Sequence, residues 1–110
     1  MIGSICVIVR RPKGEEISTL GIRTAWAGFA AALESSLLFI EDGVYSALDN
    51  SGYNTAMIKD YVKEGGKAYC FKKSMEERGL SEDDLMDGVD ILSAEEVAEI
   101  IEEAESAAIF

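Results

Sequence analysis

Residues 65–79 read Gly-Gly-Lys-Ala-Tyr-Cys-Phe-Lys-Lys-Ser-Met-Glu-Glu-Arg-Gly, and this segment contains the change from one strand to the next helix. The glycine pair is a stop signal for the helix before it, and the apolar run Ala68–Phe71 is typical of a short strand. A new helical turn is predicted to begin at Lys72. The segment therefore places one cysteine, Cys70, where a strand meets a helix.

Cys70 is a candidate reactive thiol. Only the thiolate form attacks, and nearby lysines together with the positive end of a helix lower a thiol pKa. Lys67, Lys72 and Lys73 are the nearest charges in the sequence, and the acids of this segment begin only at Glu76. The alternative is that Cys70 fills space on a buried strand, since free cysteine is among the most buried residue types.

The same alternation of strand and helix runs through the whole chain. The first predicted helix has an apolar stripe of Ile22, Trp26, Phe29 and Leu33, and Ser18 or Thr19 is predicted to cap it. Its remaining surface is alanine-rich, which favours burial of that surface in a subunit interface. A second helix is predicted to be capped by Asn54 and to run through Lys63. A later helix is predicted to begin at Ser93, where Ser-Ala-Glu-Glu matches a capping box. Strands are predicted at 2–9, 36–40, 68–71, 89–92 and 107–110.

Strands that alternate with helices predict an α/β fold, a three-layer α/β/α sandwich with a mainly parallel five-stranded sheet. The 110 residues fit a single domain over residues 1–110. No apolar run approaches the roughly 18 residues of a membrane span, and the N-terminus lacks the basic region of a signal peptide. These features predict a cytoplasmic protein that does not bind a membrane.

The net charge of −11 is placed unevenly. Residues 1–75 have nine basic and eight acidic side chains, whereas residues 76–110 have thirteen acidic side chains and one basic, Arg78. Such an acidic surface repels phosphates, so nucleic acid is not an expected partner. The acidic part either steers a basic partner or simply forms a solvated helix surface.

The residue inventory excludes several kinds of chemistry. The chain has no histidine and no Cys-x-x-Cys, so the usual zinc sites and histidine-based triads are absent, and we expect no metal and no cofactor. Cys6 lies in the middle of the first strand, where a packed core thiol is expected. After that strand, Arg10, Arg11 and Lys13 would suit an anion, although no phosphate-binding motif follows them.

Two short motifs connect these elements to a known family. Phe-Ile-Glu-Asp-Gly-Val-Tyr (39–45) follows the second strand, and Ser-Met-Glu-Glu-Arg-Gly-Leu (74–80) follows the strand that contains Cys70. With the alanine-rich first helix and a terminal strand that ends in phenylalanine, they make the chain resemble the DsrE/DsrF (TusD/TusC) family of sulfur-relay proteins over essentially its whole length.

The resemblance implies a YchN-like fold and a role in intracellular sulfur transfer. If the chain is an enzyme, the implied activity is that of a sulfurtransferase, with sulfur donor and acceptor proteins as partners. It also implies assembly into homo-trimers or hexamers, or into hetero-oligomers with related subunits. In DsrE-like members a cysteine near the end of the third strand carries a persulfide, which here implies Cys70. Lys72 and Lys73 would stabilise its thiolate, and the turn from Gly43 to Tyr45 would form part of the pocket wall.

One departure from the family pattern concerns the thiol itself. In that pattern the sulfur-carrying cysteine lies eight residues before the glycine of Arg-Gly, which here is Phe71, whereas Cys70 lies nine before Gly79. A one-residue offset turns a side chain to the other face of a strand, so Cys70 is expected to point into the core unless the strand has ended or bulged. The alternative function is therefore that of DsrF-like members, which often lack the cysteine and serve as non-catalytic subunits or binding modules. Trp26, Tyr45 and Tyr53 either line a subunit pocket or belong to the core.

Overall fold

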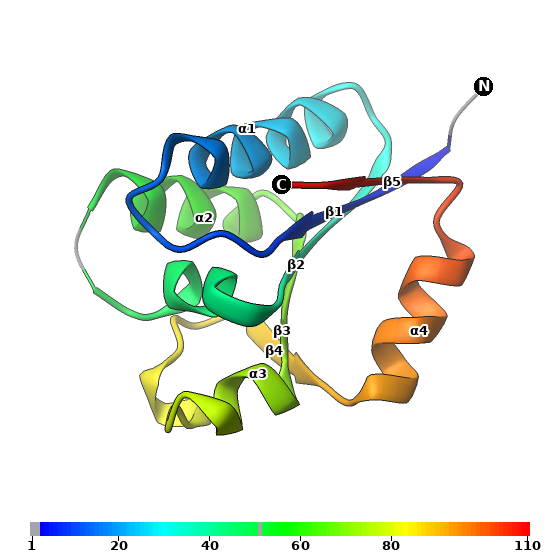
Figure 1. Cartoon of the computed structure of the whole chain (residues 1–110). Helices are drawn as coiled ribbons and strands as arrows, with labels where there is room; N and C mark the ends of the chain where they lie inside the picture. The colour runs from blue at the N-terminus through cyan, green and yellow to red at the C-terminus, as the bar shows by residue number, and fades with distance from the viewer. Residues whose placement is uncertain (1–2, 51) are drawn as a thin grey trace.

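The computed structural model describes residues 3–50 and 52–110 and has a five-stranded parallel sheet with helices on both faces (Figure 1). The α/β sandwich predicted from the sequence is therefore confirmed. The strands are β1 (Ser4–Val9), β2 (Glu34–Phe39), β3 (Lys67–Phe71), β4 (Val89–Leu92) and β5 (Ser106–Ile109). The helices are α1 (Glu16–Ala30), α2 (Tyr53–Lys63), α3 (Lys72–Glu77) and α4 (Ala94–Glu103), with 3₁₀ helices η1 (Glu41–Ala47) and η2 (Glu82–Asp84).

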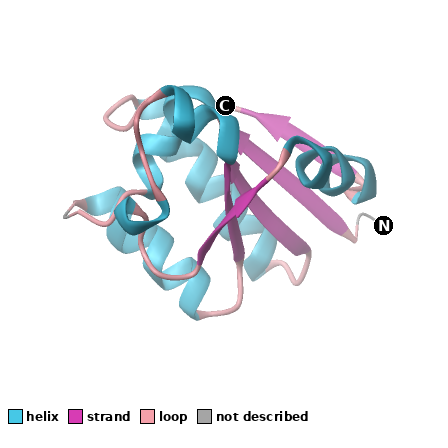
Figure 2. Cartoon of the chain, turned by 90° about the horizontal axis from the view of Figure 1, so that it is seen from below, coloured by secondary structure: helices cyan, strands magenta, loops and turns pink. Residues whose placement is uncertain are grey.

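The strand order, β4-β3-β2-β1-β5, explains the two layers of helices. From β1 to β4 each strand is added on the same side of the one before, and right-handed crossovers then place the intervening helices on one face. The direction in which strands are added to the sheet then reverses, because β5 pairs in parallel with the side of β1 that is away from β2. A right-handed crossover in that direction puts α4 on the opposite face, as Figures 1 and 2 show.

The face covered by α1 and α2 contains most of the core. Val7 and Val9 of β1, Leu37 and Phe39 of β2, and Tyr61 of α2 are all fully buried there. Helix α1 lies close to the sheet because it has glycine where the two meet. A Cβ atom on Gly21 would lie 2.9 Å from Cγ2 of Val9. We call this side the covered face.

The opposite side, which we call the α4 face, is packed more thinly. Its buried residues are Cys6, Ile8 and Leu38, and α4 packs on them through partly buried side chains such as Val97 and Ile100. No residue of α4 is fully buried. Neighbouring apolar side chains remain in solvent, including Ile109 of β5, which is 65% exposed.

The predicted caps of two helices are wrong. Helix α1 begins at Glu16, ahead of Ser18 and Thr19, and α2 begins at Tyr53 after Gly52, so that Asn54 lies in its first turn. These polar residues instead connect elements to one another. The Ser18 hydroxyl lies 3.4 Å from that of Ser46 in η1, and the Thr19 hydroxyl donates to Oδ1 of Asn54 at 3.1 Å. The predicted capping box at Ser93 is confirmed.

The predicted strands agree with the structure in order, and their bounds differ from it by up to two residues. Residue 2, which the sequence includes in the first strand, lies outside the described residues. In residues 3–50 and 52–110, no helix combines the length and the apolar character needed to cross a bilayer.

Candidate functional site

The carboxyl ends of β1, β2 and β3 form the edge of the sheet at which the sequence predicts the site. Two segments cover this edge, η1 after β2 and α3 after β3. The backbone N–H of Glu41 donates to Oγ of Ser74 at 2.9 Å, and the Arg78 guanidinium binds Oδ1 of Asp42 through two nitrogens, both at 3.0 Å. Glu41, whose N–H makes this hydrogen bond to Ser74, has a left-handed backbone conformation with φ of 51°.

These contacts join the two motifs on which the family resemblance rests. Asp42 belongs to the first motif, and Ser74 and Arg78 belong to the second. The two motifs therefore hold η1 against α3, and we call these contacts between Glu41 and Ser74 and between Asp42 and Arg78 the clasp. Sequence reasoning assigned Ser74 and Arg78 no role, although their place in the more specific motif was a usable signal.

Gly43 lies at the centre of this arrangement but faces backbone. A Cβ atom at this position would lie 1.9 Å from the carbonyl oxygen of Val9 and 3.2 Å from Cα of Arg10. Glycine is thus required for η1 to pass over the end of β1. Tyr45, two residues later, is 36% exposed. The Gly43–Tyr45 turn therefore packs on the first strand at Gly43 and reaches solvent at Tyr45.

The position of Cys70 follows from the regular pairing of β3. Residues 67–70 pair one for one with residues 36–39 of β2, and the strand continues through Phe71, so there is no bulge at the cysteine. Cys70 consequently points toward the covered face, where it is 0% exposed and part of the main core. Phe71, at the family's cysteine position, is only partly buried.

Burial also determines the chemistry of this thiol. It raises the pKa of Cys70 from about 9 to about 12, and desolvation is the cause. At pH 7 such a thiol is a thiolate in about one molecule in 10⁵. Lys72 and Lys73 are exposed on α3 and do not offset the cost of burying the charge. The expectation that these lysines lower the pKa of Cys70 is therefore wrong for this structure.

Cys6 is the core thiol that the sequence predicts. It is 0% exposed, and burial raises its pKa to about 11. Cys6 belongs to the α4 face and Cys70 to the covered face, so the sheet separates the two sulfur atoms and both cysteines are free. Within the described residues, no three Cys, Asp or Glu side chains are grouped in a way that could hold a metal ion.

The basic side chains after β1 point to different partners. Arg10 pairs with Glu41 at 3.7 Å, and Arg11 pairs with Glu15 at 3.2 Å. The Lys13 ammonium donates to the side chain of Asn50. The three cations are thus engaged separately with protein groups, and the structure does not bring them together as an anion site.

The aromatic residues named from the sequence also separate. Trp26 is partly buried and packs edge-to-face on Phe29 and Tyr61, with ring centroids 6.0 and 5.7 Å away. Its indole N–H donates to the carbonyl of Met57 at 2.9 Å, which ties α1 to α2. Tyr53 is 64% exposed and, with Trp26, lines a shallow cavity of about 370 Å³. Tyr45 does not line that cavity.

A sequence model of the DsrE/DsrF-like family matches residues 3–107, nearly the whole chain. The chain belongs to the DsrE/DsrF-like family. Membership, together with the fold, supports a role in sulfur relay at the level of the family. The family model covers β1 to β4, the clasp between η1 and α3, and the first two residues of β5.

Three known proteins are similar to this chain. The crystal structure of the ychN protein from E. coli is similar at 26% identity with a TM-score of 0.83, covering 99% of this chain and 100% of that one. A protein of unknown function from Methanobacterium thermoautotrophicum shares the fold at 19% identity, with a TM-score of 0.73 and coverage of 96% and 99%. An uncharacterised protein from Methanopyrus kandleri is 25% identical over 111 residues, covering 94% of this chain and 90% of that protein.

Proposed function

We propose that this chain is a non-catalytic subunit of a sulfur-relay assembly, a binding module rather than the protein that carries the persulfide. The observation that carries the proposal is the complete burial of Cys70 on the covered face of the sheet. Cys6, the other thiol of the chain, is equally buried. This is the DsrF-like alternative that the sequence leaves open.

The chemistry of persulfide transfer explains why burial matters. A thiolate attacks the outer sulfur of a persulfide, a new S–S bond forms, the old S–S bond breaks, and the donor leaves as its own thiolate. The attacking sulfur must be ionised and must be reached from solvent or from a partner. Cys70 meets neither requirement in the folded chain, because it is 0% exposed and burial raises its pKa to about 12.

A subunit of this kind needs a surface for its neighbours, and the outer side of α1 is the better candidate. Three apolar side chains are exposed there and on the start of α2: Ile17 at 43%, Leu20 at 53% and Tyr53 at 64%. Arg23 connects them, since it donates to the Tyr53 hydroxyl at 3.0 Å. The α4 side has exposed isoleucines too, but most of the acidic residues lie in the same part of the sequence, and two such faces would repel each other.

The proposal is tested by intact-mass analysis of the folded protein after incubation with a small alkyl persulfide. The wild type is compared with Cys70→Ser and Cys6→Ser, and wild type unfolded in urea serves as the positive control. We expect no added sulfur on any folded form and added sulfur on the unfolded one. A sulfur adduct on the folded wild type that disappears only in Cys70→Ser would overturn the proposal and identify Cys70 as a persulfide carrier.

A further inference from the structure

A cavity of about 510 Å³ lies at the amino ends of the central strands, bordered by the last turns of α4 on one side and by the end of α1 on the other. It is at the opposite edge of the sheet from the clasp, and its charged residues lie on the opposite face from Cys70. Its size is within the range of small-molecule sites. The sheet contributes Glu34, Ser36, Lys67 and Tyr69 to its lining, and α4 contributes Ile100 and Glu103.

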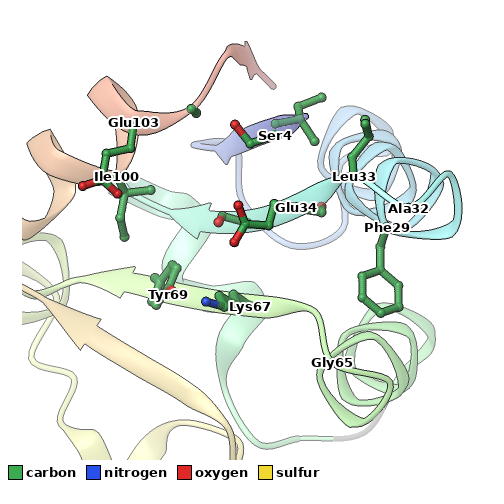
Figure 3. A pocket seen from close by; sticks show the side chains of 14 residues that line it. Ser4, Phe29, Ala32, Leu33, Glu34, Gly65, Lys67, Tyr69, Ile100 and Glu103 are labelled. Atoms are coloured by element: carbon green, nitrogen blue, oxygen red, sulfur yellow. The ribbon is translucent and has the colours of Figure 1, made fainter. Parts of the chain in front are cut away.

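The pattern of the strands explains why these side chains meet. Glu34 and Ser36 on β2, and Lys67 and Tyr69 on β3, are spaced two apart and so point to the same face. Ser36 pairs directly with Lys67, and Glu34 precedes Ser36 on that face of β2. Figure 3 shows Glu34, Lys67 and Tyr69 around the gap below α4, with Glu103 on its other side. The small side chain of Ser36 leaves the space open.

The charges in the cavity do not neutralise each other. In the described part of the chain, the Lys67 ammonium forms no ion pair with Glu34 or Glu103, and neither carboxylate pairs with another cation. The phenol of Tyr69 is available as a neutral donor. Its pKa is raised, first by desolvation and then by the negative charge of Asp90, with smaller effects from Cys6 and Glu34.

This combination of groups favours one class of ligand. Lys67 attracts an anionic group and the two glutamates attract a cationic one, so a ligand with both signs of charge fits better than a simple amine or a simple anion. With one cationic and two anionic side chains, the cavity fits a ligand whose carboxylate lies against Lys67 and whose ammonium lies between Glu34 and Glu103. Ile100 offers an apolar wall to the remainder of the ligand.

We propose that this cavity binds a zwitterionic α-amino acid with an apolar side chain. The Lys67 ammonium and the Tyr69 hydroxyl bind the carboxylate, Glu34 and Glu103 bind the ammonium, and Ile100 contacts the side chain. The site goes beyond the proposed subunit role. The site uses neither cysteine, so the result of its binding test is independent of the result of the persulfide experiment.

The test is an NMR titration of the ¹⁵N-labelled protein with L-leucine. Two analogues serve as ligand controls: 3-methylbutylamine, which lacks the carboxylate, and 4-methylpentanoate, which lacks the amine. We expect leucine to bind with a Kd of about 1 mM or below. Shifts should centre on the amides near Ser36, Lys67 and Ile100, and both analogues should bind at least about tenfold more weakly.

Matched variants locate the charges that matter. Lys67→Met and Glu34→Gln should each weaken leucine binding by about tenfold or more. Lys63→Met, an exposed lysine on α2, and Glu95→Gln, at the far end of α4, should leave it unchanged. All four positions are exposed, so the folded state is expected to persist and is checked by circular dichroism.

Three results would overturn the assignment. One is the absence of shifts at saturating leucine in a folded sample. Another is binding that Lys67→Met and Glu34→Gln leave intact. The third is equal binding of leucine and its two analogues, which would indicate apolar contact without recognition of the two charges.

Discussion

The two faces of the sheet differ in how completely helices cover them, and the ligand site that we propose borders the less covered one. The covered face is sealed by α1 and α2, and it includes Cys70 among its fully buried residues. Among the described residues, the cluster on the α4 face has three buried residues, and a cavity lined by both charged and apolar side chains is open at one end. Cys70, which the sequence suggests as a reactive thiol, therefore lies on the covered face. Glu34, Lys67 and Tyr69, to which the sequence gives no role of their own, line the open cavity.

The largest expected effect on stability comes from a substitution in the core of the covered face. Leu37→Ala should lower the free energy of unfolding by about 3–5 kcal/mol, because a fully buried leucine leaves a cavity in the main core. Ile109→Ala, on the α4 side and 65% exposed, should change it by no more than about 0.5 kcal/mol. Urea denaturation measures both, and similar losses for the two variants would contradict the contrast between the faces.

An intermediate effect comes from the pH dependence of stability. Burial raises the pKa of Cys70 to about 12 and that of Cys6 to about 11, from about 9 in the unfolded chain. Above pH 9 the unfolded state releases these protons before the folded state does, so the stability contributed by each thiol is complete below pH 9 and is lost as pH rises. By pH 10 the loss is about 1.4 kcal/mol per thiol.

Removal of both thiols isolates this contribution. In the double variant Cys6→Ala/Cys70→Ala, the fall in unfolding free energy between pH 8 and pH 10 should be smaller than in the wild type by about 2–3 kcal/mol. The slopes are compared rather than the absolute values, because each alanine also leaves a small cavity. Parallel slopes would mean that the thiols ionise as easily in the folded chain as in the unfolded one.

The smallest effect on folding concerns the outer surfaces. Leu20→Lys on α1 and Ile109→Lys on β5 both replace exposed apolar side chains, and each should alter monomer stability by no more than about 0.5 kcal/mol. If subunits associate through α1, Leu20→Lys should shift sedimentation velocity profiles toward smaller species, and Ile109→Lys should not. The reverse pattern would move the interface to the α4 side.

Much of the fold was readable from the sequence because strand and helix periods are local signals. The places of all five strands along the chain follow from apolar runs, and the capping box at Ser93 is visible because its two partners lie three residues apart. The starts of α1 and α2 were missed for a physical reason. Ser18, Thr19 and Asn54 have good capping side chains, but tertiary contacts between elements use them instead.

The candidate site was harder to predict because it depends on which face of a strand is closed. Lys72 and Lys73 are neighbours of Cys70 in sequence, yet they lie on an exposed helix while the thiol lies in the core. The one-residue offset of Cys70 from the position expected by resemblance to the family did predict that its side chain points into the core. Among the charged residues of the cavity, only Lys67 was named from the sequence, and only for its nearness to Cys70, although the alternation of Lys67 with Tyr69 gave a signal for a polar stripe.

The alternation of side chains along β3 has a consequence for how such proteins evolve. Tyr69 and Phe71 occupy one face and Cys70 the other. Deletion or insertion of a single codon in the turn before β3 would slide the strand by one residue and transfer the sulfur atom from one side of the sheet to the other. The side of the sheet to which this sulfur atom belongs would then depend on the length of one turn, with no cysteine created or destroyed.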